Sequence, residues 1–459
     1  MSTECTGQSY LFQPLGRRRV EACFDGGAIT SDGGALLLSA TERRTSILRR
    51  FAGCFTDHRD PARVSHTTTE LVSQRVFGLA LGYEDLVDHD DWRHDPLLGV
   101  LLGRRDPGDR PLAGKSTLNR LELTPADATA ADRYKKVVLD EGAVDRLLVD
   151  VFLEAHDAPP EEIIIDLDAT DDPLHGQQEG RFFHGYYDGY CYLPLYIFCG
   201  EHLLCARLRT ADIDGAAGSV EELDRIVGQI REAWPKTHVI IRADSGFCRE
   251  AIMSWCETHS VDFVLGIAKN TRLTGMIERA QEDAAVMHAL TNKPARVFRE
   301  LRYRTLDSWS CTRRVVAKAE HMDKGSNPRF IVTSLSVDKL DGKTLYEEVY
   351  CARGDMENRI KEQQNYLFAD RTSAATMRAN THRLLFSSIA YLLLSAMRRI
   401  ALAGTSMARA QCHTIRNKLL KIGARIRVTA RRVWISMASG WPYQAIFAQA
   451  HAQLVRPPG

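Results

Sequence analysis

Short apolar runs are the clearest pattern in the middle of the chain. Residues 163–168 and 239–244 are apolar runs that each end in an aspartate, which is typical of buried strands. Residues 191–199 and 202–208 are two further apolar runs, joined by Gly200-Glu201. A glycine turn between two such runs predicts a β-hairpin.

The elements that follow narrow the fold class. Residues 220–234 predict a helix, the strand to Asp244 comes next, a helix runs through Cys256, and residues 263–265 predict another strand. The order is therefore three strands, a helix, a strand, a helix and a strand. This is the order of the ribonuclease-H-like fold. We expect an α/β, ribonuclease-H-like (retroviral-integrase-like) catalytic core.

The regions on either side of this core have different patterns. Residues 1–158 contain Asp-Gly-Gly turns and helical stretches and end before Pro159-Pro160, which predicts a separate, mixed and helical N-terminal region. Residues 159–370 form the predicted catalytic domain, and a basic, alternating segment at about 271–347 predicts an inserted β structure. Residues 371–459 predict a basic helical C-terminal region.

Charge is distributed unevenly along the chain. The net charge of the 459 residues is only +1, but residues 371–459 contain fourteen Lys and Arg residues and no Asp or Glu. A basic tail on an acidic body indicates a polyanionic partner, so we expect this tail to contact nucleic acid. The candidate phosphate contacts are Lys418, Lys421, Arg425, Arg427, Arg431 and Arg432, with Trp434 beside them.

Cysteines and apolar segments exclude other classes of protein. The eleven cysteines include no Cys-x-x-Cys pair, so the sequence indicates neither a zinc module nor a disulfide scaffold. The longest apolar run, residues 384–397, is shorter than the ~20 residues that a bilayer requires, and it predicts a buried helix. The N-terminus lacks an apolar signal core. We expect a cytoplasmic protein.

Three acidic residues are candidates for a catalytic site. Asp168 and Asp244 each end a predicted strand, and Glu357 lies in a later helical stretch. Hard divalent cations take carboxylate oxygens, often from separate elements. Tyr350, Arg353 and Glu357 are spaced three and four residues apart, so they share one face of a helix.

Two aspartates compete for the first ligand position. Asp166 and Asp168 are two apart on a strand, so both point to the same side of the sheet. Strand geometry alone therefore does not decide which of them is the ligand.

These motifs resemble a known family. The spacing of Tyr350, Arg353 and Glu357 resembles the signature around the third catalytic acid of bacterial insertion-sequence transposases of the DDE class. Residues 166–170, 242–247 and 350–362 resemble specifically the 1380 family of insertion sequences, and the resemblance extends over nearly the whole chain.

One position departs from the pattern of neighbouring families. They place a Lys seven residues after the glutamate, where this chain has Gln364. Lys361, one helical turn beyond Glu357, is the candidate replacement.

The resemblance implies a catalytic site and a cofactor. Asp168, Asp244 and Glu357 would hold two Mg²⁺ or Mn²⁺ ions, and Asp168 is favoured as the ligand because a small residue and a Thr follow it. Asp166 would be a supporting residue, deeper in the sheet. The expected activity is metal-dependent cleavage and strand transfer of DNA.

The resemblance also implies DNA contacts and partners. Tyr350, Arg353 and Lys361 would bind phosphate, and Trp309, in the inserted segment, is a candidate for stacking on a displaced base. The partners would be double-stranded DNA, as terminal inverted repeats and as target, and a second copy of the chain on paired ends. The N-terminal region and the basic tail would recognise the repeats. No membrane is implied, and the location would be the bacterial cytoplasm.

Two other functions are compatible with parts of the sequence. One is a catalytically silent, transposase-derived DNA-binding protein. The other is a haloacid-dehalogenase-type phosphatase, in which Asp166 would be the nucleophile and Asp168 the acid-base. Such a phosphatase also needs a later Gly-Asp-x-x-x-Asp block, and the nearest candidate, Gly354-Asp355, continues to Arg359 instead.

Two further motifs do not support a ligand site. Gly114-Lys115-Ser116 lacks the glycine spacing and the preceding strand of a nucleotide-binding loop. His175 and His184 have no partner at zinc-ligand spacing, so we interpret them as loop or DNA-contact residues.

Overall fold

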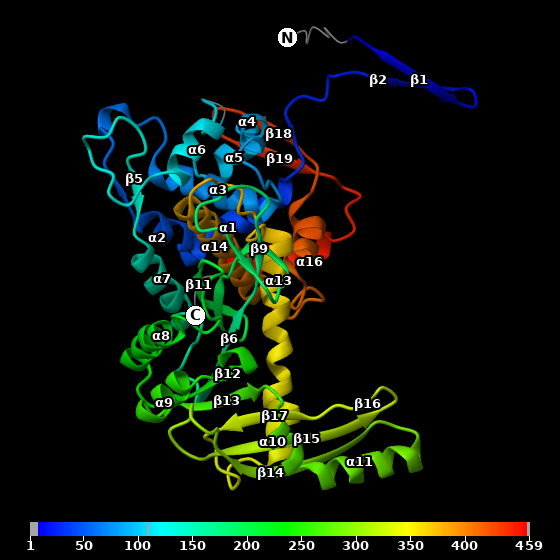
Figure 1. The fold of residues 1–459 in the computed structure, drawn as a ribbon. Helices are drawn as coiled ribbons and strands as arrows, with labels where there is room; N and C mark the ends of the chain where they lie inside the picture. Colours follow the sequence, from blue (N-terminus) through cyan, green and yellow to red (C-terminus); the bar gives the residue numbers. More distant parts are fainter. Residues whose placement is uncertain (1–7, 108–109, 457–459) are drawn as a thin grey trace. The chain divides into compact units, whose positions relative to one another are not determined.

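The protein forms two compact units, which are considered separately. The computed structural model describes residues 8–107 and 110–456 (Figure 1). The first unit comprises Met1–Asp140, Tyr366–Phe368 and Ile389–Gly459, and the second comprises Glu141–Asn365 and Ala369–Ser388. We expected separate N-terminal and C-terminal regions, but the two ends of the chain belong to one unit.

A mixed sheet forms the centre of the second unit. In the described residues its strand order is β11-β10-β6-β12-β13-β17-β15-β14, and β16 pairs with β15. β12 is parallel to both β6 and β13, and the other pairs are antiparallel. The strands are β6 (Glu162–Ala169), β10 (Leu195–Cys199), β11 (His202–Arg207), β12 (His238–Ala243), β13 (Asp262–Ile267), β14 (Ala295–Tyr303), β15 (Arg313–Met322), β16 (Gly325–Ser326) and β17 (Arg329–Thr333).

The two strands predicted to end in aspartate are β6 and β12, and both are central. Ile165 and Ile241 are fully buried on one face of the sheet, and Ile240 is buried on the other. Burial on both faces explains why these strands are continuous apolar runs rather than alternating ones. The predicted hairpin is also present, as β10 and β11, and Gly200 in its turn has a φ of +59°. A positive φ favours glycine.

The helices that contribute to the core of this unit include α7 (Glu141–Leu153), α8 (Ser219–Ala233) and α9 (Glu250–Thr258), which Figure 1 shows beside the sheet. Leu223, Ile226 and Ile230 of α8 are fully buried in the same cluster as Ile165 and Ile241. Their spacing of three and four residues is the helical period, so one face of α8 packs on the sheet.

A small three-stranded sheet lies beyond β6 in the chain. It has the order β7-β9-β8, with β7 (Asp172–Pro173), β8 (Phe182–His184) and β9 (Gly189–Tyr192).

The segment predicted to be an inserted β structure contains both helices and strands. It begins with α10 (Thr271–Met276) and α11 (Glu278–Thr291), and β14 to β17 follow. These strands extend the main sheet, because β17 pairs with β13. The helices were not predicted.

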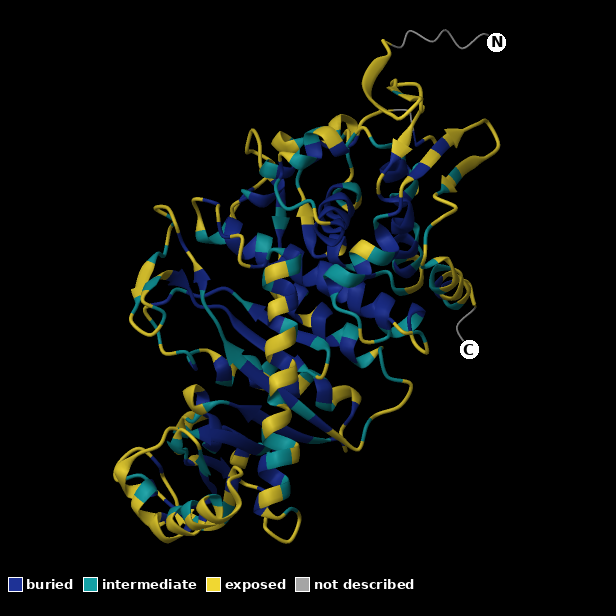
Figure 2. Cartoon of the chain, turned by 90° about the vertical axis from the view of Figure 1, so that its right-hand side faces the viewer, coloured by how far each residue is buried: buried dark blue, intermediate teal, exposed yellow. Residues whose placement is uncertain are grey.

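A continuous helical segment carries the Tyr-Arg-Glu motif. It consists of α12 (Gly342–Thr344), a π-helical stretch η4 (Leu345–Tyr350), a 3₁₀ turn η5 (Cys351–Arg353) and α13 (Gly354–Leu367). Helix type therefore changes within the motif, as it often does at functional sites. In Figure 2 the outward side of this segment is exposed, and the sheet behind it is buried.

The apolar run 384–397 lies in the next helix, α14 (Met377–Ala401). By length and composition, α14 is the one described helix that could cross a membrane, but 89% of its most apolar window is buried inside the protein. This burial agrees with the prediction of a core helix.

The first unit is mostly helical and joins the two ends of the chain. Strand β3 pairs with β18, with Thr30 opposite Ala424. A Cβ on Gly34 would lie 1.8 Å from the carbonyl oxygen of Leu419, so this close approach requires glycine. The elements are β1 (Tyr10–Leu15), β2 (Arg18–Ala22), β3 (Ile29–Thr30), η1 (Gly33–Ala35), α1 (Leu36–Thr45), α2 (Ile47–Gly53), β4 (Phe55–Asp57), η2 (Pro61–Arg63), α3 (Thr68–Leu81), α4 (Asp88–Trp92), α5 (Pro96–Leu101), α6 (Lys115–Glu122), β5 (Val137–Leu139), α15 (Cys412–Ile415), η6 (Arg416–Leu420), β18 (Ala424–Val428), β19 (Val433–Met437) and α16 (Gln444–Val455).

The expectation of a helical C-terminal region is wrong for its most basic part. Residues 424–437 form the antiparallel hairpin β18–β19, in which Ile426 pairs with Ile435 and Arg427 with Trp434. Basic and β-branched residues alternate along β18, and this period of two fits a strand with one exposed face.

Candidate active site

Two neighbouring strands bring the first two acids together. Asp168 is the penultimate residue of β6, and Asp244 directly follows β12. These strands are parallel and in register, with Ala243 opposite Leu167. Because carboxyl ends of parallel strands meet at one edge of a sheet, the two aspartates lie at the same edge.

Arg353 joins all three candidate acids. Its Nη2 lies 3.0 Å from Oδ2 of Asp168 and 3.8 Å from Oδ2 of Asp244, and its Nη1 lies 3.3 Å from Oε1 of Glu357. Glu357 is in the first turn of α13, four residues after Arg353, so the helical face predicted from the sequence is present. One guanidinium therefore connects two strand ends and a helix.

Burial and charge set the proton affinities in this cluster. Burial raises the pKa of Asp168 to about 6; Arg353 opposes this rise, and Asp244 and Glu357 add to it. Burial by itself would lower the pKa of Arg353, but the three carboxylates raise it overall. The side chains of Asp168 and Arg353 are only 15% and 14% exposed, whereas those of Asp244 and Glu357 are 42% and 48% exposed. A ligand would therefore approach from the side of Asp244 and Glu357.

Tyr350 lies close to the same strand end, and a glycine provides its space. A Cβ on Gly266 of β13 would lie 2.5 Å from the hydroxyl oxygen of Tyr350 and 2.9 Å from the amide nitrogen of Ser245. Burial raises the pKa of Tyr350, Arg353 lowers it, and Asp244 raises it further. The sequence analysis did not identify Gly266, because nothing local distinguishes it from other glycines in strands.

Asp166 lies deeper in the sheet and is paired with an arginine. Nε and Nη2 of Arg242 donate to its two carboxylate oxygens at 2.5 and 2.7 Å, and both side chains are nearly fully buried. Arg242 also donates to the carbonyl of Val349, the residue before Tyr350. Arg242 therefore connects the sheet to the helical segment, a role that the sequence analysis missed. Both oxygens of Asp166 are occupied, which disfavours it as a nucleophile.

Gln364 lies against a second buried carboxyl. Its Nε2 donates to the carbonyl of Asp171 at 3.1 Å and to Oδ1 of Asp172 at 3.0 Å. Lys361, on the same helix, is exposed. Gln364 thus links α13 to β7, and Lys361 is the cation that remains accessible.

The carboxyl of Asp172 holds its proton at neutral pH. Complete burial raises the pKa of Asp172 to about 8; the Gln364 hydrogen bond lowers it, and Asp370 and Asp171 raise it. Because the pKa of Asp172 is raised in the folded state, its protonated carboxyl makes its full contribution to folding stability below the unfolded-state pKa of about 4. That contribution is lost as the pH rises through about 8.

We therefore predict that Asp172→Asn will be more stable than the wild type at pH 8 to 9. Melting temperatures measured from pH 5 to 9 should fall for the wild type and change much less for the variant. Asp212→Asn, which changes an exposed aspartate of the same unit, is the control and should follow the wild type. Parallel curves for wild type and Asp172→Asn would show that the carboxyl is already charged in the folded protein.

Several other candidate residues lie away from the acidic cluster or have other partners. The ring of Trp309 is only 4% exposed and packs edge-on against Tyr303, so neither face is open to a base. Lys421 is paired with buried Asp32 at 2.7 Å, and its Nζ lies 4.2 Å from the centre of the Tyr83 ring. These contacts leave Trp309 and Lys421 unsuited to the DNA contacts expected of them.

The remaining basic candidates are grouped on the first unit. Lys418 is partly exposed, with its Nζ 5.2 Å from the ring centre of Tyr443. The ring of Trp434 is 45% exposed and lies beneath the guanidinium groups of Arg427 and Arg432. The exposed arginines of the hairpin are Arg425, Arg427, Arg431 and Arg432.

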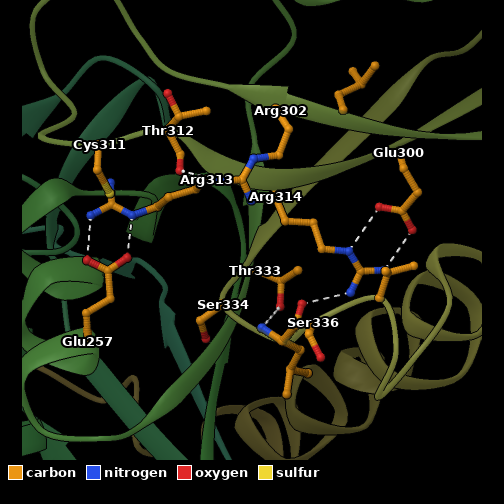
Figure 3. Close-up of a pocket in the computed structure, with 13 residues that line it drawn as sticks. Glu257, Glu300, Arg302, Cys311, Thr312, Arg313, Arg314, Thr333, Ser334 and Ser336 are labelled. Atoms are coloured by element: carbon orange, nitrogen blue, oxygen red, sulfur yellow. Dashed lines mark hydrogen bonds and ion pairs between the residues drawn. The ribbon is translucent and has the colours of Figure 1, made fainter.

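A cavity at the end of β14, β15 and β17 is a poor alternative site. It has a volume of about 550 Å³, and none of the three acids lines it. Its two buried arginines are already paired, Arg313 with Glu257 and Arg314 with Glu300 (Figure 3). Paired guanidinium groups at fixed positions indicate a structural role.

The acidic cluster has the donors that a hard cation requires, but a guanidinium now lies among them. Three carboxylates supply the oxygen ligands that Mg²⁺ prefers. Among residues 8–107 and 110–456, however, no three His, Cys, Asp or Glu side chains are grouped closely enough to hold a metal as they stand. Arg353 lies within 4 Å of all three acids instead, so the donor types fit a divalent cation but a guanidinium lies among them.

Comparison with known proteins assigns the chain to a class. The family described as Transposase DDE domain group 1 matches residues 12–458, so this chain belongs to that family of DDE transposases. Members of this family generally use divalent metal ions.

Individual proteins add little to this assignment. Curated proteins give no match to the chain. One similar solved structure is the cryo-EM structure of piggyBac transposase synaptic complex with hairpin DNA, which is 11% identical in sequence and has a TM-score of 0.42. The alignment covers 94% of this chain and 83% of that chain. That score is too low to establish a shared fold.

Proposed function

We propose that this chain cuts and joins the ends of an insertion sequence, with Asp168, Asp244 and Glu357 as ligands for two divalent metal ions. The observation that carries the proposal is the convergence of these three acids on Arg353. In this proposal the sheet is a ribonuclease-H-like core, extended by the inserted strands β14 to β17. The resemblance to the 1380 family of insertion sequences supports the same function.

The proposed chemistry assigns a role to each side chain. Bound divalent ions would polarise the phosphodiester and favour deprotonation of an attacking water or 3′-hydroxyl. Asp168 is fixed by the sheet, whereas Asp244 and Glu357 are more exposed and lie on the side from which DNA would approach. Arg353 and Tyr350 would bind a phosphate oxygen beside the cleaved bond, because a guanidinium and a phenol are both good donors to phosphate. Exposed Lys361 would add a third cationic contact.

Supporting residues would hold this arrangement in place. The pair of Asp166 and Arg242 fixes β6 against β12 and anchors the carbonyl of Val349. Gln364 fixes α13 against β7. Joining two transposon ends requires two active sites, so we also infer that the chain works as a homodimer on paired ends.

The test is cleavage of a duplex that carries the imperfect inverted repeats flanking the gene. Metal-dependent nicking at the repeat boundary in Mg²⁺ or Mn²⁺ is the expected result. Binding without cleavage at any metal concentration would identify a silent DNA-binding protein instead.

The position of Arg353 leads to a prediction about metal affinity. Replacing Arg353 by Gln removes a positive charge that lies 3.0 to 3.8 Å from the three carboxylates. Unit charges 4 Å apart interact by about 4 kcal/mol near a protein surface, and solvent screening reduces this value. We expect the DNA-free variant to bind Mn²⁺ at least about tenfold more tightly in calorimetry. Cleavage should fall, because a phosphate contact is lost.

The matched control is Lys343→Gln, an exposed cation earlier in the same helical segment. It should leave Mn²⁺ affinity unchanged. Equal or weaker Mn²⁺ binding by Arg353→Gln would mean that Arg353 and the metal do not compete for these acids.

A further inference from the structure

A second charged site lies in the first unit, in a cavity of about 740 Å³. Residues 104–107 and 110, which follow α5, form one wall and the tip of the β18–β19 hairpin forms the other, although the two segments are more than 300 residues apart in the chain. The lining residues are Glu70, Arg104, Arg105, Asp106, Pro107, Arg110, Val428, Thr429, Ala430, Arg431, Arg432 and Val433. Five arginines and two acids therefore surround it.

One of the five arginines has a structural role. Arg104 donates to Oε1 of Glu70 at 2.8 Å and to the carbonyl of Arg110 at 2.7 Å. Its side chain is only 10% exposed. This arginine neutralises Glu70 and fixes the loop, which leaves Asp106 as the other acid of the lining.

Four arginines remain exposed around the cavity: Arg105, Arg110, Arg431 and Arg432. Within the described residues, no carboxylate lies within ion-pair distance of any of them. Several like charges around one cavity cost electrostatic free energy, which binding of an anion would recover.

The hairpin tip is held in a fixed conformation. The amide of Thr429 donates to the carbonyl of Arg432 at 2.9 Å, and the amide of Arg432 donates to the hydroxyl of Thr429 at 3.1 Å. Val428 and Val433 flank this turn and are 43% and 40% exposed. A fixed turn with two adjacent arginines and apolar flanks suits a charged backbone with apolar sugars.

We propose that this arginine cavity binds the sugar-phosphate backbone of duplex DNA, so that the two ends of the chain contact the DNA jointly. The inference rests on the proposed function, and it locates DNA contacts outside the acidic cluster. Guanidinium groups bind phosphate oxygens in bidentate geometry, and such contacts position DNA without reading its sequence. Arg105 and Arg110 thereby join Arg431 and Arg432, which the sequence had indicated.

The test compares DNA affinity at several salt concentrations. The Arg431→Ala/Arg432→Ala double variant should bind a duplex more weakly, and the slope of log affinity against log salt should decrease by about 2, one for each phosphate contact. The Arg105→Ala/Arg110→Ala variant should show the same decreases in DNA affinity and in slope, although its substitutions lie on the opposite wall of the cavity. Fluorescence anisotropy with a repeat-containing duplex and a scrambled duplex gives both quantities.

The control removes the same charge from the same unit. Arg43 and Arg63 are exposed and do not line the cavity, so Arg43→Ala/Arg63→Ala should leave the slope nearly unchanged. Arg431→Lys/Arg432→Lys should retain most of the affinity, which separates charge from folding defects. Equal losses with both duplexes support a backbone contact.

Three outcomes would overturn the inference. One is a loss of DNA affinity no larger than that of the control variant. Another is a loss of affinity for the repeat-containing duplex alone, which would indicate base readout. The third is preferential binding of single-stranded RNA at this site. Failure of the proposed function is distinguishable, because the wild type would then bind neither duplex or bind without cleaving. Arginine variants that lose affinity while Glu357→Gln keeps it would establish two separate sites.

Discussion

Replacing Glu357 by Gln is expected to lower metal-dependent DNA cleavage by about a thousandfold and to leave DNA affinity unchanged. Loss of a metal ligand removes several kcal/mol of transition-state stabilisation, and each 1.36 kcal/mol is a factor of ten in rate. The side chain of Glu357 is 48% exposed and pairs with Arg353. The substitution should therefore alter folding stability by no more than about 0.5 kcal/mol.

The control for this prediction is Glu348→Gln, which changes an exposed acid in the same helical segment. Its cleavage rate should equal that of the wild type. Cleavage rates are measured in single turnover and DNA affinity by anisotropy. Wild-type cleavage by Glu357→Gln would remove Glu357 from the ligand set, and a parallel loss of DNA affinity would assign it to binding.

The second large effect concerns the pair of Asp166 and Arg242, where we predict a loss of folding stability. Removing one partner of a buried ion pair leaves an uncompensated charge and costs about 3–5 kcal/mol. Asp166→Ala and Arg242→Ala should each lower the free energy of unfolding by that amount in urea. The double variant Asp166→Leu/Arg242→Met should recover most of it, because apolar residues of similar volume replace both charges.

A further variant, Asp166→Asn, separates the transposase from the phosphatase hypothesis. A phosphatase would lose hydrolysis of a small phosphate ester in Asp166→Asn without a large loss of stability. The pairing of both Asp166 oxygens with Arg242 predicts no such hydrolysis in the wild type. Ester hydrolysis that depends on Asp166 would contradict the structural role of this pair.

Local patterns were sufficient to predict the elements that carry the candidate site. β6 and β12 each contain three apolar residues in succession because both sheet faces are covered, and an aspartate follows near the end of each run. Helical spacing likewise puts Arg353 and Glu357 on one face. The contact between that face and the strand ends depends on long-range packing, so the sequence suggested it only through resemblance.

The residues that sequence reasoning missed act through partners far away in the chain. Arg242 pairs with Asp166, 76 residues earlier, and Gln364 donates a hydrogen bond to Asp172, 192 residues earlier. Gly266 matters only because the hydroxyl of Tyr350 is packed against it. No local pattern reports such pairings, and one signal alone was available: a charged residue within an apolar strand, as at Arg242, requires a buried partner.

The C-terminal hairpin is a different kind of failure, because its signal was local. Ile426 and Val428 alternate with basic residues, which is a strand pattern, whereas the charge of this segment indicates only an anionic partner. The ion pair of Lys421 with buried Asp32 has no local signal in the sequence, because Asp32 lies near the other end of the chain.

The most direct test of the central claim is a change of metal preference in Asp244→Cys. The side chain of Asp244 is 42% exposed, so a thiolate fits there, and thiolate is a softer ligand that favours Mn²⁺ or Cd²⁺ over Mg²⁺. We predict that cleavage of repeat-containing DNA is lost in Mg²⁺ and partly restored in Mn²⁺ or Cd²⁺. Wild-type cleavage in Mg²⁺, or an equal loss in all three metals, would contradict a metal site at these acids.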